Sequence, residues 1–161
     1  MSQTFEYPNL LIGSRSGVGW TYDHGSFDAY NHHCLFNDSK NENYMCSPLY
    51  PLKHGITYAF SAFSANTENF MGSDIYVLYA GGYSIGDGWI AGHMGFMKGP
   101  GGWVTYTYSL PSTSPEGNYY LRFDNNGSTD GKTSLIWLEN PMLCIASEPH
   151  AWAPAEGEVW P

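Results

Sequence analysis

Large residues alternate strictly with small polar ones along residues 104–110. Val104, Tyr106, Tyr108 and Leu110 fall on one side of an extended segment, and the residues between them are threonine or serine. A period of two with β-branched and aromatic residues is typical of a strand that has one buried and one solvated face. The segment therefore predicts a half-buried β-strand.

The same pattern recurs elsewhere, with no helical periodicity of comparable length in between. Residues 56–64 alternate in this way, and residues 74–80 are apolar on both faces, which indicates a central strand. In residues 119–124 we expect Tyr119, Leu121 and Phe123 to face inward. Successive strands without helices predict an all-β fold, an antiparallel two-sheet β-sandwich.

Turn residues and the chain ends complete this organisation. The segment 125–131, with sequence NNGSTDG, predicts an Asn-Gly hairpin turn before a closing strand at 134–143 that Pro141 interrupts. We expect a first strand at 9–12. The predicted units are an N-terminal tail (1–8), one β-sandwich (9–147) and an extended C-terminal tail (148–161).

Charge and hydropathy narrow the function classes. The chain has 161 residues, enough for one substantial core, and its net charge is −9. A phosphate backbone or an anionic membrane surface would be repelled, so we expect neither nucleic acid nor membrane as a partner. No apolar run approaches the length of a membrane-spanning helix, and no signal peptide is visible at the N-terminus.

The cysteine and histidine residues give little indication of metal binding or catalysis. Cys34, Cys46 and Cys144 have no metal-binding spacing, and their odd number favours small buried side chains, with a Cys34–Cys46 disulfide left open. His32 and His33 are adjacent on an extended segment, point to opposite faces, and so cannot both bind one ion. No common hydrolase, zinc-protease or nucleotide-binding motif occurs, and we do not expect an enzyme.

The order of these signals resembles a known family. It is similar to the carbohydrate-binding-module-like (galactose-binding-like) jelly roll of many secreted glycosidases. The ending is similar to the version common in phage and prophage tail proteins, and the resemblance covers roughly residues 9–156. The residues that support it are Asn9-Leu10-Leu11, Gly55 to Ala62, Gly102-Trp103, Tyr120 to Phe123, Pro141-Met142-Leu143 and Trp152 to Glu156.

The resemblance implies a jelly roll of two sheets, and its enzyme-attached members bind sugars and commonly hold a structural calcium. Those members usually show an acidic pair in the closing strand, where this chain has Glu139-Asn140 with one carboxylate, so a structural calcium stays open and no other cofactor is expected. The segment Asp124 to Asp130 offers oxygen ligands at calcium-like intervals but lacks a downstream bidentate glutamate. A plain turn is favoured there.

Sugar binding needs flat apolar faces beside planar polar groups. Tyr120, Arg122 and Asp124 should face away from the core, and Tyr76 and Trp137 on neighbouring strands could share that surface. The alternative is that these aromatic residues cover a second packed layer or a subunit contact, and that Arg122 merely pairs with Asp124.

A second candidate site is the glycine-rich segment 83–96, which carries Asp87, Trp89 and His93 at a predicted sandwich rim. The alternative is that its glycines permit tight turns while Trp89 closes one end of the core. The carbohydrate-binding candidates are Tyr76, Trp89, Tyr120, Arg122, Asp124 and Trp137.

Together these patterns favour a non-catalytic carbohydrate-binding-module-like domain of a phage or prophage tail, or of another surface-adhesion protein. The alternative is a purely structural virion or tail assembly module without a sugar ligand. The expected partners are a glycan or other virion tail proteins, and a homo-oligomer stays open. The expected location is the virion or the extracellular space.

Overall fold

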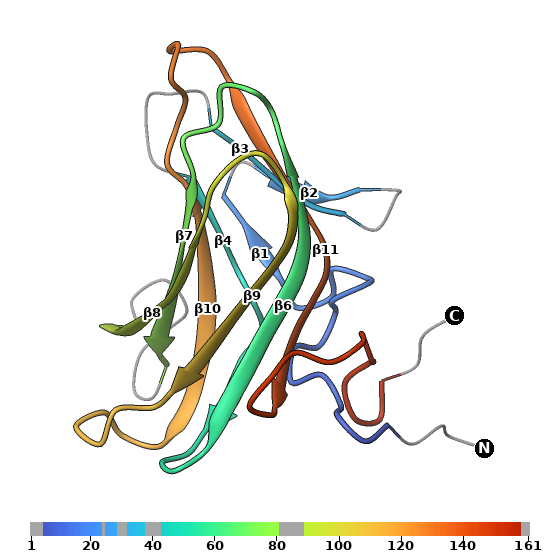
Figure 1. Cartoon of the computed structure of the whole chain (residues 1–161), viewed down its shortest axis with the longest axis vertical. Coiled ribbons are helices and arrows are strands. Elements are labelled where there is room, and N and C mark those ends of the chain that lie inside the picture. Colours follow the sequence, from blue (N-terminus) through green and yellow to red (C-terminus); the bar gives the residue numbers. More distant parts are fainter. Residues whose placement is uncertain (1–4, 24, 29–31, 38–42, 81–88, 159–161) are drawn as a thin grey trace.

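In the described part of the chain, eleven strands form two sheets that pack face to face (Figure 1). The computed structural model describes residues 5–23, 25–28, 32–37, 43–80 and 89–158, with only the backbone at 36, 37 and 89–91. The strands are β1 (Thr21–Tyr22), β2 (Gly25–Phe27), β3 (His32–Asn37), β4 (Asn43–Cys46), β5 (Tyr50–Leu52), β6 (Thr57–Asn66), β7 (Ser73–Tyr79), β8 (Trp89–Met97), β9 (Gly102–Ser109), β10 (Gly117–Asn125) and β11 (Ser134–Ile145).

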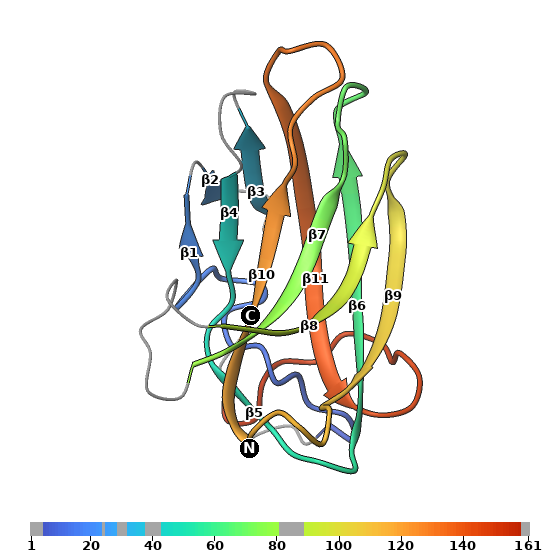
Figure 2. The same ribbon diagram turned by 90° about the vertical axis from the view of Figure 1, so that its left-hand side faces the viewer.

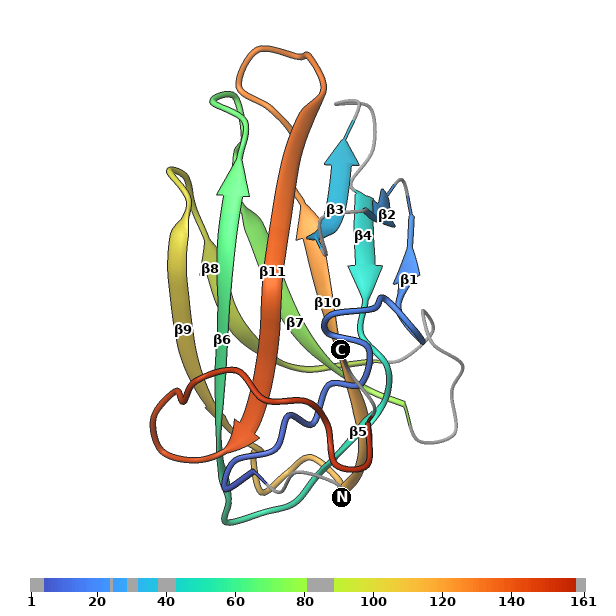
Figure 3. The same ribbon diagram turned by 90° about the vertical axis from the view of Figure 1, so that its right-hand side faces the viewer.

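The first sheet has the order β1-β4-β10-β7-β8, with β5 also paired to β10 (Figure 2). The second sheet has the order β2-β3-β11-β6-β9 (Figure 3). All of these strand pairs are antiparallel. The predicted two-sheet antiparallel sandwich is confirmed. Within the described ranges, no helix is long and apolar enough to cross a membrane.

Side-chain alternation places the core between the sheets as predicted. Tyr119, Leu121 and Phe123 of β10 are fully buried, and they pack in the same core cluster as Phe60 of β6. On β9, Tyr106 also points inward and packs against this cluster, while the threonines of the strand are exposed. The aromatic residues that occupy one face of each strand therefore fill a single core.

Two glycines of β8 make room for the tyrosines of β9. A Cβ atom at Gly95 would lie 2.5 Å from the Tyr106 ring, and one at Gly92 would lie 2.7 Å from the Tyr108 hydroxyl. Any larger residue at these positions would have to displace a tyrosine ring. The glycines therefore allow the two edge strands to close one side of the sandwich.

The connection between β10 and β11 differs from the prediction. These strands belong to different sheets, so residues 126–133 cross from one sheet to the other and the predicted hairpin is wrong. The Asn125 side chain is fully buried and organises the crossing. Its Oδ1 accepts bonds from the Gly127 amide and the Ser134 hydroxyl, and its Nδ2 donates to the Ser134 carbonyl. Asn-Gly chemistry specifies a turn without specifying which strands it joins.

Two strand boundaries also differ. Residues 9–12 form no strand, only an isolated bridge between Asn9 and Ala155. The Asn9 side chain adds bonds to the Pro141 carbonyl and the Leu143 amide. β11 continues past Pro141 through a register shift between Glu139 and Met142, with Asn140 at φ 51°. Proline donates no backbone hydrogen bond, so the strand bulges there and resumes.

Both terminal segments pack across one end of the second sheet's outer face (Figure 3). Phe5, Tyr7 and Trp152 contact a small buried cluster that includes Ala59 of β6 and Met142 of β11. In Figure 3 these segments do not cross the other half of that face. The proposed division of the chain into tails and sandwich stays a prediction.

Replacing Gly95 with alanine should destabilise the fold. The added methyl group would press on the Tyr106 ring, and overpacking of this kind typically costs about 1–3 kcal/mol of unfolding free energy. Urea denaturation of Gly95→Ala measures this loss. The control is Thr105→Ala, because the Thr105 side chain is exposed on β9. Equal midpoints for the two variants would contradict the proposed close packing.

Candidate functional site

An arginine–aspartate pair lies on the outer face of the first sheet. Arg122 and Asp124 are two residues apart on β10, so both point away from the core. Arg122 Nε lies 2.7 Å from Asp124 Oδ1, and Asp124 is only 1% exposed. The guanidinium carbon also lies 4.1 Å from the centre of the Tyr44 ring. The arginine is thus held from two sides, by a carboxylate and by a π face.

Strand pairing extends this surface across the sheet. Tyr76 of β7 is opposite Arg122, and His93 of β8 is opposite Tyr76, with 5.3 Å between the two ring centres. His93 Nε2 lies 2.8 Å from Asp74 Oδ1, which accepts its hydrogen bond. We call these residues the Arg122 surface: Tyr44, Asp74, Tyr76, His93, Arg122 and Asp124.

Tyr120 points to this side of the sheet, as predicted, but its ring is fully buried. It packs with Cys46 and Leu78 in a small second cluster on the outer face. A buried ring offers no face to a ligand, so the expectation of an exposed Tyr120 is wrong. Of the predicted residues, the structure brings Tyr76, Arg122 and Asp124 together on this face, where Asp124 is buried against Arg122.

The two predicted tryptophans do not join this group. Trp137 lies on β11, paired with Cys34 of β3 and Ala65 of β6 in the second sheet, so the prediction that it shares a surface with Tyr76 is wrong. The alternation of β11 indicated which residues face outward without indicating which sheet they belong to. The backbone of Trp89 pairs with Tyr79 in β8. The Trp89 side chain and Asp87 lie outside the described residues.

His32 and His33 point to opposite faces of β3, as predicted. His33 is buried, its Nδ1 accepts a bond from the Tyr22 hydroxyl at 2.8 Å, and its Nε2 donates to the Ser14 carbonyl at 2.8 Å. This pattern fixes the neutral tautomer with the proton on Nε2. Burial lowers the pKa of His33 to about 4. His33 is therefore a structural residue.

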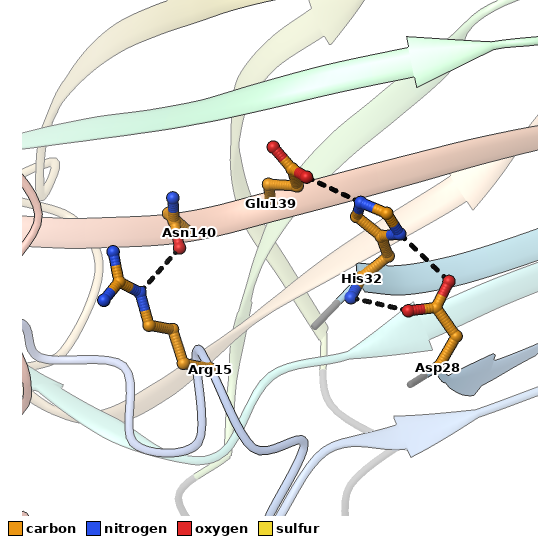
Figure 4. A network of polar contacts seen from close by, with 5 residues as sticks. All are labelled: Arg15, Asp28, His32, Glu139 and Asn140. Carbon is orange, nitrogen blue, oxygen red and sulfur yellow. Dashed lines mark hydrogen bonds and ion pairs between the residues drawn. The ribbon is translucent and has the colours of Figure 1, made fainter. Parts of the chain in front are cut away.

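His32 instead lies between two carboxylates on the outer face of the second sheet (Figure 4). Its Nδ1 is 3.0 Å from Asp28 Oδ2 and its Nε2 is 2.6 Å from Glu139 Oε1. Burial alone would lower the pKa of His32, but the hydrogen bonds to both carboxylates outweigh it and raise the pKa. Because carboxylates only accept, both ring nitrogens donate and the imidazolium form is favoured.

Cationic side chains bind both Glu139 and Asn140. These two residues occupy the positions of the calcium-binding acidic pair in the family that the sequence resembles. Glu139 accepts from His32, and Asn140 Oδ1 accepts from Arg15 Nε at 2.8 Å (Figure 4). The Arg15 guanidinium also stacks 3.5 Å over the Trp152 ring. Calcium needs about six to eight oxygen ligands. Among the described residues no group of three or more His, Cys, Asp or Glu side chains could hold a metal ion. Because the side chains of Glu139 and Asn140 are already bonded to cationic groups, this pair as it stands does not fit calcium.

The segment Asp124 to Asp130 is likewise committed to protein contacts. Asp124 pairs with Arg122, while Asp130 Oδ1 accepts hydrogen bonds from Asn69 and from the Lys132 amide. All three cysteines are free, and Cys46 and Cys144 are buried as small side chains. The open alternative of a Cys34–Cys46 disulfide is excluded, because both of these cysteines are free.

Sequence reasoning missed several residues that the fold brings together. Tyr44 and Asp74 join the Arg122 surface only through strand pairing, which no local pattern reveals. Phe63 and Trp103 pair across the second sheet and are 37% and 65% exposed. The only sequence signal for these two residues was their outward-facing position in the alternating pattern of each strand. A hollow of about 540 Å³ at the rim, lined by Glu68, Phe70, Met71, Lys98 and neighbouring loop residues, was also missed.

No protein-family model matches this chain, and no curated protein matches its sequence. Solved structures do match its fold. A CBM4 carbohydrate-binding module has a TM-score of 0.61 at 13% identity, covering 84% of this chain and 100% of the module. The N-terminal cellulose-binding domain of Cellulomonas fimi β-1,4-glucanase C has a TM-score of 0.59 at 14% identity, covering 81% of this chain and 91% of that domain.

A viral structure matches as well. The tripod from the baseplate of bacteriophage Tuc2009 has a TM-score of 0.58 at 13% identity, and the match covers 96% of this chain and 61% of the tripod chain. At such identities the likeness shows the fold alone. The chain therefore has the jelly-roll fold of carbohydrate-binding modules, which also occurs in phage tail proteins, and the predicted resemblance is confirmed at the level of fold.

Acid should destabilise the fold through His33. Since its pKa falls from 6.5 in the unfolded chain to about 4 in the folded one, the unfolded chain binds more protons between these values. The stabilising effect is complete above pH 6.5 and is lost as the pH falls towards 4, by up to about 1.4 kcal/mol per pH unit. Urea denaturation across this range should show a shallower pH dependence for His33→Gln than for the wild type. A pH dependence that His33→Gln leaves unchanged would contradict this role of His33.

Arg15 should stabilise the β11 bulge where the family would place a metal. Arg15→Ala removes the bond to Asn140 and the contact with Trp152, so we expect a loss of about 1–2 kcal/mol of unfolding free energy, measured by urea denaturation. Adding calcium or a chelator should leave the wild-type midpoint unchanged. A midpoint that rises with calcium would show that the folded protein binds calcium, and it would contradict our conclusion that Glu139 and Asn140 do not fit this ion.

Proposed function

We propose that this chain is a non-catalytic carbohydrate-binding module that presents the Arg122 surface to a glycan. The observation that supports this best is the fixed guanidinium of Arg122, held by buried Asp124 and the Tyr44 ring on the sheet face opposite the core. The Arg122 side chain is 25% exposed while Asp124 is 1% exposed, so the arginine presents a positioned cationic group at the sheet surface. A group that is already positioned loses less freedom when a ligand binds, which favours ligand recognition.

The chemistry of this surface matches the two needs of sugar recognition. Tyr76 and His93 supply ring faces for the C–H side of a pyranose ring, and they lie in the strands next to Arg122. Arg122, Asp74 and Asn126 supply hydrogen-bond donors and acceptors for hydroxyl groups, with Asn126 Nδ2 bonded to Asp74 Oδ2 at 2.8 Å. The residues span β4, β10, β7 and β8, so a short oligosaccharide could lie across the strands.

The charge of the chain favours an uncharged glycan. At a net charge of −9, long-range electrostatics oppose the approach of polyanionic sugars. The matched cellulose-binding domain of the β-1,4-glucanase is named for an uncharged polysaccharide. We therefore infer that the Arg122 surface binds neutral glycans built from hexoses.

The setting we propose is a phage or prophage tail, where such a module would attach the particle to a host surface. The Tuc2009 baseplate tripod, which shares the fold over nearly all of this chain, supports this setting. The protein would then act in the virion or the extracellular space. In a purely structural assembly module, by contrast, the same surface would contact another tail protein.

Substitution of Tyr76 tests the proposal. Wild-type protein on an array of neutral, amino and acidic glycans should bind neutral glycans, and Tyr76→Ala should weaken that binding roughly five- to tenfold because one stacking face is lost. Isothermal titration with the best array glycan measures the change.

Tyr7→Ala is the matched control, because Tyr7 also stacks on a histidine, His150, with 3.5 Å between ring centres, but lies with the terminal segments on the second sheet. It should bind as the wild type does. No binding to any glycan at millimolar concentration, together with a stable oligomer in size-exclusion chromatography, would favour the structural module instead.

A further inference from the structure

A second aromatic surface lies on the outer face of the opposite sheet. Trp103 of the edge strand β9 is 65% exposed and Phe63 of β6 is 37% exposed, and their rings meet edge to face with centres 6.0 Å apart. The terminal segments cross the other end of this face, at Ala59 and Met142 (Figure 3). Contiguous exposed aromatic residues on a folded domain mark an interaction site.

Strand register arranges four residues of this face as a rectangle. Ala65 of β6 is paired with Trp137 of β11, and Phe63 is paired with Glu139. The two rings, Phe63 and Trp137, therefore occupy one diagonal, and the small Ala65 and the acidic Glu139 occupy the other. With His32 these four residues line a hollow of about 130 Å³, which we call the Phe63–Trp137 pocket.

The spacing within the pocket suits one flat ring. Diagonal neighbours on paired strands are roughly 7–8 Å apart, with their Cβ atoms somewhat closer. A ring between two apolar faces needs about 3.5–4.0 Å on each side, which gives the same span. Because Ala65 has only a methyl group, the floor between the two rings stays low. The hollow is also well below the roughly 300 Å³ of pockets for larger ligands.

One wall of the pocket is a positioned hydrogen-bond acceptor. Glu139 is 41% exposed at its side chain, and His32 holds one of its oxygens at 2.6 Å. His32 is in turn held by Asp28 at 3.0 Å from the opposite side (Figure 4). The carboxylate orientation is therefore fixed before a ligand arrives, which lowers the ordering cost of binding. A carboxylate accepts hydrogen bonds from hydroxyl groups and repels other anions.

We propose that the Phe63–Trp137 pocket is a second sugar site, which binds a single uncharged pyranose ring between Phe63 and Trp137 with its hydroxyl groups donating to Glu139. His32 is a positioning residue for Glu139, and Trp103 extends the apolar face beyond the pocket. The site lies on the sheet opposite the Arg122 surface, and its existence does not depend on glycan binding there.

Titration with small sugars tests this site directly. The probes are the methyl glycosides of glucose, galactose, mannose and N-acetylglucosamine at millimolar concentration, added to the ¹⁵N-labelled full chain. At least one should shift the indole N–H signal of Trp137, assigned with Trp137→Phe. Methyl glucuronide, which is anionic, should bind at least tenfold more weakly.

Filling the pocket separates binding from folding. Ala65→Leu places a larger side chain on the exposed floor and should weaken binding at least tenfold, while Thr107→Leu, an exposed change on the same face of β9, should leave it unchanged. Glu139→Gln should also weaken binding, because an amide is a poorer acceptor than a carboxylate. Tyr76→Ala should leave it intact, which distinguishes this site from the Arg122 surface.

Three results would overturn the proposal. The first is that no glycoside moves the Trp137 signal. The second is an affinity that Ala65→Leu leaves unchanged. The third is a wild-type dimer in size-exclusion chromatography that Ala65→Leu converts to a monomer, because the pocket would then serve self-association. In each case glycan binding by the Arg122 surface could still be measured with Tyr76→Ala.

Discussion

Every strand of this sandwich divides its side chains between the shared core and one outer face, and the rest of the structure depends on that division. On β10, Tyr119, Leu121 and Phe123 are buried between the sheets, while Arg122 and Asp124 stand on the outer face. A one-residue slip would exchange the two sets and bury the ion pair in the core. Core packing therefore decides which face carries Arg122 and Asp124, independently of the hydrogen bond between them.

Local periodicity predicted the strands because it records this division directly. The alternating segment around Tyr106 and the inward set of β10 are where the pattern placed them. The partner of each strand is a non-local property, however. Trp137 faces outward as its strand predicts, but from the second sheet, and the NNGSTDG segment turns the chain from one sheet into the other. Which sheet a strand joins depends on core shape, which a single segment does not encode.

The candidate site was likewise predictable within one strand but not between strands. Arg122 and Asp124 could be paired from a spacing of two along one strand, whereas Tyr44 and His93 come from strands far away in sequence. The burial of Tyr120 also followed from neighbours rather than from its own strand. The calcium position shows the same limit, since Arg15 reaches Asn140 from 125 residues away.

The two outer faces are independent surfaces of one scaffold. Between them lies a packed core, and face-to-face sheets are about 10 Å apart, so residues on the two faces share no contacts and changes on them should add without coupling. If both proposed sites bind sugar, their opposite directions prevent one short glycan from reaching both. Two chains of the same glycan coat would then be needed, and each site would raise the effective concentration for the other only while both chains are held. That geometric condition, rather than the affinity of either site alone, would decide how firmly one module attaches.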